Sequence, residues 1–185
     1  MPNRGILLLL PLTLACSEDP PPPDVPADVA WCDAVADWSD YEVDFELAIL
    51  DEVNQRRAAG ATCGKDEEFP AVPALTMDPA LRCAARRHSL AMAEDDFFAH
   101  GSTEEDTPAA RLEQAGYDGV GLDETLSGGV PTAELVVEGW MGSTGLCRIV
   151  MSAAATEVGI GYARATPIDG VPAYADYVTM NLGQD

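Results

Sequence analysis

Lysine, histidine and long apolar runs are scarce in this sequence. The chain of 185 residues has a single lysine, Lys65, and two histidines, and its 32 acidic against 10 basic side chains give a formal net charge of −22. A chain so poor in cations cannot neutralise phosphates, which excludes nucleic-acid binding and electrostatic attachment to anionic lipid. The apolar fraction of 47% is normal for a folded core, and the length suits one domain with appendages.

The sequence also lacks the short motifs of several enzyme classes. It contains no phosphate-binding loop, no dinucleotide-binding glycine pattern, no HExxH and no CxxC. Residues 141–145 resemble a nucleophile elbow, but Met141 stands where that motif has its first glycine. A Ser-His-acid triad would have to recruit His88 or His100, so we do not expect this chemistry.

The first fifteen residues have the pattern of an export signal. Arg4 precedes an apolar run over residues 6–14 that is too short to span a bilayer, and Ala15 and Cys16 follow. The site resembles that of bacterial lipoproteins, so we predict cleavage after Ala15 and attachment to a membrane through lipidated Cys16. Ordinary signal-peptidase cleavage is the alternative. The chain is therefore expected to be exported, either anchored at the bacterial cell envelope or secreted.

Residues 16–30 are rich in proline and acidic side chains and offer little to bury. Such a segment favours polyproline II, which would make it a spacer of about 40 Å. The remaining residues, 31–185, are predicted to form one domain.

Four cysteines remain in this domain, and an even number in an exported chain argues for two disulfides. Four cysteines allow three connectivities, of which we predict Cys32–Cys83 and Cys63–Cys147. A zinc site is disfavoured because the cysteines do not occur as close pairs.

Helix signals dominate most of the domain, and strand signals follow at its end. Four N-cap residues each precede apolar residues at helical spacing and predict helices over residues 39–60, 78–94, 107–116 and 132–140. Residues 157–163 and 173–180 alternate like strands, and Asp169 and Gly170 between them are a turn signal, which predicts an antiparallel hairpin. Helices followed by antiparallel strands indicate an α+β class.

His100 is the more informative of the two histidines. It follows Phe97 and Phe98, which we expect to pin this segment to the core while the imidazole stays partly exposed. An imidazole so placed can bind a metal, act as a base or orient a carboxylate. The acidic residues 94–96 and 104–106 lack EF-hand spacing and are expected to form a solvated rim. His88 lies on the apolar side of its helix and is expected to be a packing residue.

A longer pattern connects these residues. It runs through residues 88–93, 97–102, 111, 115–117, 123–129, 136–145 and 157–162. Together they resemble the CAP superfamily, which includes cysteine-rich secretory proteins, antigen 5 and plant pathogenesis-related class-one proteins, and they are most similar to its bacterial secreted branch. The resemblance covers about residues 46–182. It implies a three-layer α-β-α sandwich with a small antiparallel sheet, whose third strand lies near residues 122–126.

The resemblance also implies a central cleft with two histidines and two acidic residues, which in some members hold a divalent metal. His100 matches the first histidine, and Glu124 matches the glutamate of the family's Gly-Glu-Asn motif. Leu146 stands in place of the second histidine, and the position of the second acid falls near Gly142 or Ser143, so that acid is missing too and two of the four ligands remain. We therefore expect His100 and Glu124 to lie within hydrogen-bonding distance in a cleft shared with Leu146 and Ser143. Such a cleft is expected to bind a divalent metal weakly or not at all, and no other cofactor is expected.

Three functions fit this pattern. The first is a non-enzymatic binding module at the cell envelope for a lipid, glycan or protein, with Tyr117, Trp140 and Leu146 contributing to binding. The second is a hydrolase, namely metal-assisted peptide cleavage, in which His100 and Glu124 polarise water. The third is a structural envelope lipoprotein held together by its disulfides. The loss of two cleft residues disfavours the second, because general acid–base chemistry needs a second positioned group.

Overall fold

The computed structural model describes residues 24–165 and 172–185. The predicted signal sequence, Cys16 and the predicted turn at Asp169 and Gly170 lie outside the described residues. In chain order the elements are η1 (Ala30–Val35), α1 (Asp40–Ala59), β1 (Ala61–Cys63), β2 (Glu67–Phe69), β3 (Thr76–Met77), α2 (Pro79–Asp95), α3 (Pro108–Gln114), β4 (Val120–Gly128), α4 (Ala133–Gly142), α5 (Thr144–Val150), β5 (Glu157–Arg164) and β6 (Asp176–Gln184). None of the described helices is long and apolar enough to cross a membrane.

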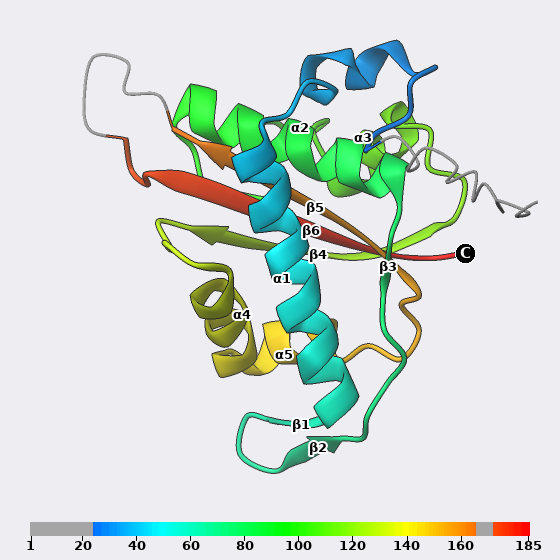
Figure 1. The fold of residues 1–185 in the computed structure, drawn as a ribbon, viewed down its shortest axis with the longest axis vertical. Coiled ribbons are helices and arrows are strands. Elements are labelled where there is room, and N and C mark those ends of the chain that lie inside the picture. Colours follow the sequence, from blue (N-terminus) through cyan, green and yellow to red (C-terminus); the bar gives the residue numbers. More distant parts are fainter. Residues whose placement is uncertain (1–23, 166–171) are drawn as a thin grey trace, which may run out of the picture.

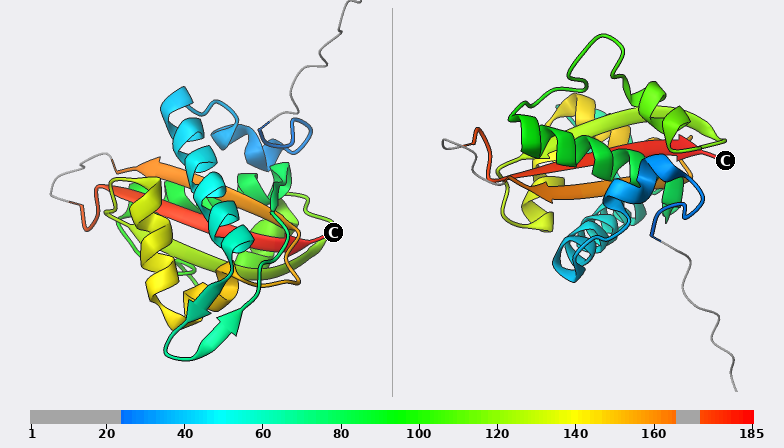
Figure 2. Two further views of the ribbon diagram at one scale, coloured as in Figure 1. Left: turned by 60° about the horizontal axis from the view of Figure 1, so that its bottom comes forward. Right: turned by 90° about the horizontal axis from the view of Figure 1, so that it is seen from above.

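The elements form three layers around one four-stranded sheet (Figure 1). α1, α4 and α5 cover one face, where Ile49, Val137 and Val150 pack with Ile160 and Met180 of the sheet. α2 covers the other face, and the view from above in Figure 2 shows the sheet between α2 and α1. The predicted α+β class and the α-β-α sandwich are confirmed.

The sheet has the strand order β3-β5-β6-β4. β5 and β6 pair antiparallel as predicted, and β4 pairs antiparallel with β6 and supplies the expected third strand. Two features were not predicted. β3 pairs parallel with β5, and β1 and β2 form a separate antiparallel ladder.

The four predicted helices begin at the predicted caps. Ser39 forms a complete capping box with Glu42, and the side chains of Asp78, Thr107 and Thr132 each accept a hydrogen bond from the backbone N–H three residues on. These caps satisfy N–H groups that a helix leaves unpaired at its start, which is why the helices begin there.

α2 lies unusually close to the sheet because β5 carries glycines beneath it. A Cβ atom at Gly159 would collide with the backbone of Leu81, and one at Gly161 with the backbone of Arg86. Ser89 fills part of this contact by donating a hydrogen bond to the carbonyl of Gly161 at 2.9 Å. The close approach fixes the position of α2, which carries His88.

Both predicted disulfides are confirmed. Cys32–Cys83 joins η1 to α2, and Cys63–Cys147 joins β1 to α5. Each bond links segments far apart in the chain, so each restricts the unfolded state strongly.

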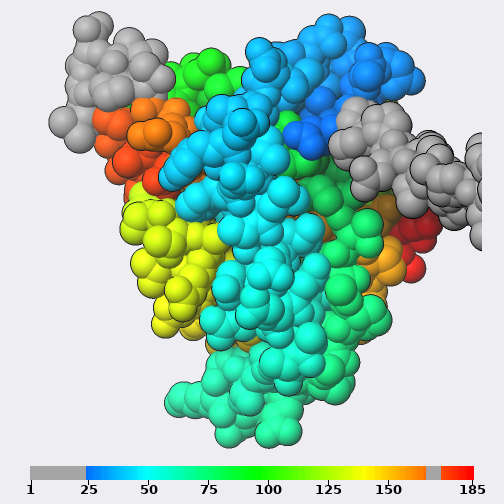
Figure 3. Space-filling view, viewed as in Figure 1, coloured from blue at the N-terminus to red at the C-terminus, as the bar shows by residue number. Residues whose placement is uncertain are grey.

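The chain packs against the domain earlier than the predicted boundary at residue 31. Val25 is buried, and Asp24 lies 2.8 Å from Arg82 and 3.3 Å from Arg86. Both arginines also bind the fully buried Glu46 of α1. The space-filling view shows this N-terminal segment resting on the body of the molecule beside α1 (Figure 3). Part of the segment predicted as a free spacer is therefore attached to the domain.

Candidate functional site

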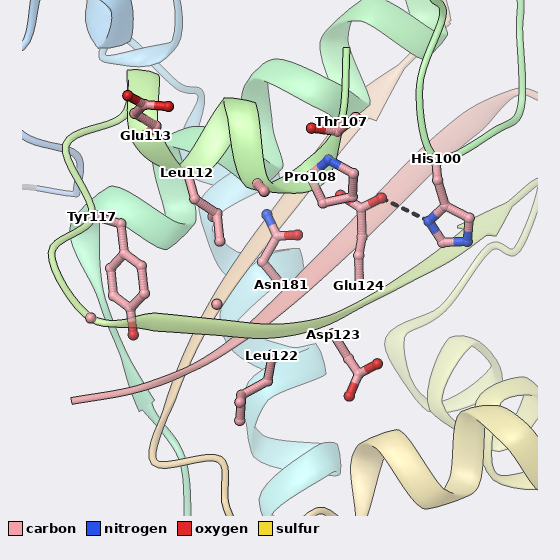
Figure 4. A pocket seen from close by; sticks show the side chains of 13 residues that line it. His100, Thr107, Pro108, Leu112, Glu113, Tyr117, Leu122, Asp123, Glu124 and Asn181 are labelled. Carbon is pink, nitrogen blue, oxygen red and sulfur yellow. Dashed lines mark hydrogen bonds and ion pairs between the residues drawn. The ribbon is translucent and has the colours of Figure 1, made fainter. Parts of the chain in front are cut away.

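A pocket of about 650 Å³ lies between α3 and β4, and we call it the α3–β4 pocket. Tyr117 stands at one end and His100 with Glu124 at the other (Figure 4). The residues that α3 and β4 contribute to its lining are Pro108, Ala109, Leu112, Glu113, Gly121, Leu122, Asp123 and Glu124.

Glu124 organises the polar end of the pocket. Its Oε1 lies 2.8 Å from Nδ1 of His100, and its Oε2 accepts a hydrogen bond from Nη2 of Arg111 at 2.8 Å. The family resemblance predicted this His100–Glu124 hydrogen bond. Because Nδ1 faces a carboxylate, this nitrogen carries the proton, and Nε2 is the ring nitrogen left for a ligand. The His100 side chain is 61% exposed, whereas that of Glu124 is 2% exposed.

Arg111 fastens α3 to this cluster. Its Nη1 donates to a carboxylate oxygen of Asp106 at 2.6 Å, and its Nη2 also donates to the backbone carbonyl of His100 at 3.0 Å. Asp106 in turn accepts from the backbone N–H of Ser102. Burial opposes ionisation of Asp106, but the hydrogen bonds from Ser102 and Arg111, together with the positive charge of Arg111, outweigh it and lower the pKa of the carboxyl. The loop that carries His100 is thus held by side chains rather than by regular secondary structure.

His88 approaches the same cluster from α2. It is 1% exposed, and its Nε2 lies 2.9 Å from the carbonyl oxygen of Ala99, so Nε2 carries the proton. Burial, followed by the positive charge of Arg111, lowers the pKa of the His88 imidazole. His88 is therefore a neutral packing residue that supports the chain just before His100, as its place on the helix indicated.

The two phenylalanines before His100 behave differently from each other. Phe97 packs against the cluster formed by Met92 and Tyr177, whereas Phe98 is 43% exposed and lies edge-on to Tyr174. Phe97 therefore pins the segment as expected, and Phe98 does not.

Asn181 of β6 lies on the floor of the pocket, directly across the strand pair from Glu124. It is 2% exposed, and neither its Oδ1 nor its Nδ2 has a hydrogen-bond partner among the described residues. Nine in ten or more buried polar groups in proteins are paired, so this amide is exceptional.

The other residues expected in the cleft lie elsewhere. Leu146 belongs to α5 and packs against the main core, and Ser143 is the exposed residue between α4 and α5. Neither lines the α3–β4 pocket. Trp140 is 1% exposed and donates its indole N–H to the carbonyl of Leu126, which makes it a core residue.

The donors in the cluster do not fit a metal site. Across residues 24–165 and 172–185, no group of three or more His, Cys, Asp or Glu side chains is placed to hold a metal ion. The guanidinium of Arg111 also lies on one oxygen of Glu124 and would repel a second cation there. A zinc ion needs at least three protein donors, and His100 with Glu124 supplies two.

Sequence reasoning missed the roles of Arg111 and Asn181. Arg111 was part of the family pattern but was given no role, although an arginine one turn into a short helix beside an acidic loop is a signal for loop anchoring. Asn181 fell just beyond the predicted strand, which ended at residue 180. Its polar amide on the α2-facing side of β6 was the available signal.

Comparisons with known proteins agree with this architecture. A profile described as the cysteine-rich secretory protein family, CAP, matches residues 50–182. An extracellular SCP-domain protein of Bacillus anthracis superposes with a TM-score of 0.61 at 20% identity, over 78% of this chain and 41% of that one. An outer surface protein of Borrelia burgdorferi superposes with a TM-score of 0.59 at 17% identity, over 79% of this chain and 96% of that one.

A cysteine-rich secretory protein of Staphylococcus aureus gives a TM-score of 0.55 at 12% identity, over 79% of this chain and 40% of that one. This chain therefore spans about two fifths of the Bacillus and Staphylococcus proteins. No curated protein matches the sequence. At these identities the solved structures show the fold, and the profile, which covers well over half of the chain, shows that this protein belongs to the CAP family.

Proposed function

We propose that this chain is an exported, lipid-anchored binding module of the bacterial cell envelope, which takes its ligand in the α3–β4 pocket without chemical turnover. The observation that carries the proposal is the pocket itself. It has a volume suited to a small ligand or a segment of a polymer, apolar walls and a few fixed polar groups, which is the usual composition of a binding site.

The state of Glu124 favours binding over catalysis. Both of its carboxylate oxygens are already paired, one with His100 and one with Arg111. Both oxygens are therefore already engaged in hydrogen bonds, and the described residues offer neither a complete metal site nor a second acidic side chain hydrogen-bonded to His100. The cluster is therefore suited to holding His100 in a fixed orientation toward a ligand.

The anchor would be Cys16. Residues 17–23 separate it from Asp24, which is held on α2 by two arginines. Seven residues reach at most about 25 Å, so the domain would lie close to the bilayer rather than on a long spacer. The Bacillus protein is an extracellular protein and the Borrelia protein is an outer surface protein, which supports this location.

A pocket-filling variant tests the proposal. The protein is sedimented with bacterial peptidoglycan sacculi, with vesicles of phosphatidylethanolamine and phosphatidylglycerol, and with a detergent extract of envelope proteins. Leu112→Trp should fill the pocket and weaken retention by about tenfold or more, whereas Leu135→Trp, on an exposed face of α4, should leave it unchanged. Equal retention of both variants, or no retention by any fraction, would contradict the proposal, and the second result would favour a purely structural lipoprotein.

A hydrolase is the second candidate, and the exposed imidazole favours it. With Nδ1 fixed by Glu124, Nε2 of His100 faces solvent and could accept a proton from water. This candidate predicts cleavage of a fluorogenic peptide library that is abolished by His100→Ala and retained by His88→Gln. The binding proposal predicts no turnover in either protein.

A further inference from the structure

The amide of Asn181 is the one buried polar side chain lining the α3–β4 pocket that has no hydrogen-bond partner among the described residues. An asparagine side chain offers two donors and an acceptor, and here both Nδ2 and Oδ1 are unpaired although the residue is 2% exposed. Leaving such a group unpaired is unfavourable, because it loses its hydrogen bonds to water and gains none in the protein. A ligand that forms hydrogen bonds with this amide at the bottom of the pocket would remove that penalty, so the pocket is suited to such a ligand.

The same protein shows what an asparagine amide does when it is paired. Nδ2 of Asn54 donates to the carbonyl of Leu75 at 3.1 Å, and Oδ1 of Asn54 accepts from the N–H of Leu75 at 2.8 Å. One side-chain amide therefore forms hydrogen bonds with both the N–H and the C=O of one residue in an extended segment beside β3. An unpaired asparagine amide in a pocket can form the same two hydrogen bonds with one residue of a bound peptide.

This double contact selects for peptides over other amide-bearing compounds. In an extended peptide the N–H and C=O of one residue point to the same side, as in a hydrogen-bonded pair of an antiparallel sheet. In a single trans amide, such as the N-acetyl group of a sugar, the N–H and C=O point in opposite directions. An asparagine side chain can therefore satisfy both of its ends on one peptide residue but only one end on an N-acetyl group.

The charges around the pocket restrict the peptide further. Its lining contains the carboxylates of Glu113, Asp123 and Glu124 and no lysine or arginine. Glu124 is neutralised by Arg111, but Glu113 and Asp123 are exposed and form no ion pair with another described residue. An acidic peptide would be repelled, whereas a neutral or basic one would not. Leu112 and Pro108 form the apolar roof, against which an apolar side chain would pack.

We propose that the α3–β4 pocket binds an extended, uncharged or basic peptide segment, and that Asn181 pairs with the N–H and C=O of one residue of that segment. The inference rests on the proposed function and names its ligand class. Figure 4 shows the Leu112 and Asn181 side chains in the same pocket, and because Asn181 is 2% exposed, a lining side chain has to move for a peptide backbone to reach the amide.

The test uses blocked tripeptides whose backbone can be edited. The purified protein is titrated with N-acetyl-Ala-Leu-Ala-amide, with the same peptide flanked by lysines or by glutamates, and with a depsipeptide in which an ester oxygen replaces the central N–H. N,N′-diacetylchitobiose is the sugar probe. Binding is measured by shifts of the backbone amide signals in NMR spectra. The neutral and basic peptides should bind, the acidic one should bind more weakly, and the depsipeptide should lose about tenfold in affinity.

The variant Asn181→Leu tests whether Asn181 is the contact. It should weaken binding of the peptide by about tenfold and should no longer distinguish peptide from depsipeptide. Because it removes an unpaired buried amide, it should unfold at the same temperature as the native protein or higher, which shows that loss of binding is not loss of the fold.

Three results would overturn the inference. They are binding of none of the peptides, equal binding of peptide and depsipeptide by the native protein, and tighter binding of diacetylchitobiose than of every peptide. The outcome for Leu112→Trp in the sedimentation experiment separates these failures from failure of the proposed function. If that variant loses envelope binding while no peptide binds, the pocket is a binding site for another class of ligand.

Discussion

Nη2 of Arg111 lies 2.8 Å from Oε2 of Glu124, and both side chains are almost completely buried, at 4% and 2% exposure. The pair joins α3 to β4 across one wall of the α3–β4 pocket. A buried ion pair gives little net stability by itself, but removing one partner leaves the other charge without compensation. The pair therefore makes the position of α3, and with it the shape of the pocket, depend on the charge of Glu124.

Neutralising Glu124 should destabilise the fold. Glu124→Gln leaves the buried Arg111 guanidinium with Asp106 as its remaining carboxylate, so we expect a loss of about 3 kcal/mol, at the low end for a broken buried pair. Urea unfolding measures it. Glu138→Gln, on the exposed side of α4, is the matched control and should stay within about 0.5 kcal/mol of the native protein. Equal stabilities of the two variants would mean that the Arg111–Glu124 contact is dispensable.

The same pair should keep the site from binding zinc tightly. His100 and Glu124 supply two donors, and Arg111 lies on the second oxygen of Glu124. Calorimetric titration of the native protein with zinc and with calcium should therefore give no binding in the nanomolar range. Leu146→His adds a third donor only if α5 moves toward His100, because Leu146 is a partly buried residue packed against the main core and does not line the α3–β4 pocket. Nanomolar zinc affinity that disappears in His100→Ala would show that donors have been missed.

The buried His88 should make the protein less stable in acid. Its pKa in the folded protein is lowered from a usual value of 6.5, mainly by burial. Below pH 6.5 the unfolded chain therefore binds a proton that the folded chain does not, and stability falls as the pH falls. The loss should be about 1.4 kcal/mol for each pH unit until the folded-state pKa is reached.

His88→Gln keeps a donor toward the carbonyl of Ala99 but does not titrate. As the pH is lowered from 6.5 to 5, the free energy of unfolding of the native protein should therefore fall relative to that of the variant. A difference that stays constant over this range would contradict a lowered pKa at His88.

Much of the fold could be predicted from short sequence patterns. The helices begin at capping residues, and the last two strands alternate, because caps and alternation are decided within a few residues. α5 could not be read in this way, since Ser143 makes no side-chain cap and the helix spans seven residues. The two-residue strand β3 exists only because β5 lies beside it, and no short sequence pattern encodes such a contact.

The candidate site could be predicted only in part from the sequence, and only through the family resemblance. The resemblance led to His100 and Glu124, whose contact joins residues 24 positions apart. It also directed attention to Leu146, which in this structure is partly buried, packs against the main core and does not line the pocket. Asn181 could not be identified as unpaired from sequence, because that property depends on how β4, β6 and α3 meet around it.

Two glycines test why α2 sits so close to the sheet. A Cβ at Gly159 would collide with the backbone of Leu81, which cannot move aside as a flexible side chain can. Gly159→Ala should therefore push α2 away from β5 and cost about 3 kcal/mol, the upper part of the range for overpacking. Because α2 carries His88, the cluster around Glu124 should loosen as well.

Gly139, within α4, is the matched control. A Cβ there would meet nothing within 4 Å, and its φ is not in the left-handed region. Gly139→Ala should therefore stabilise the protein by about 0.5–1 kcal/mol, because alanine loses less backbone entropy in a helix. The same change at two glycines should thus have opposite signs in urea unfolding. If Gly159→Ala were as stable as Gly139→Ala, α2 could shift without cost, and close packing of α2 on β5 could not be what fixes His88 beneath the site.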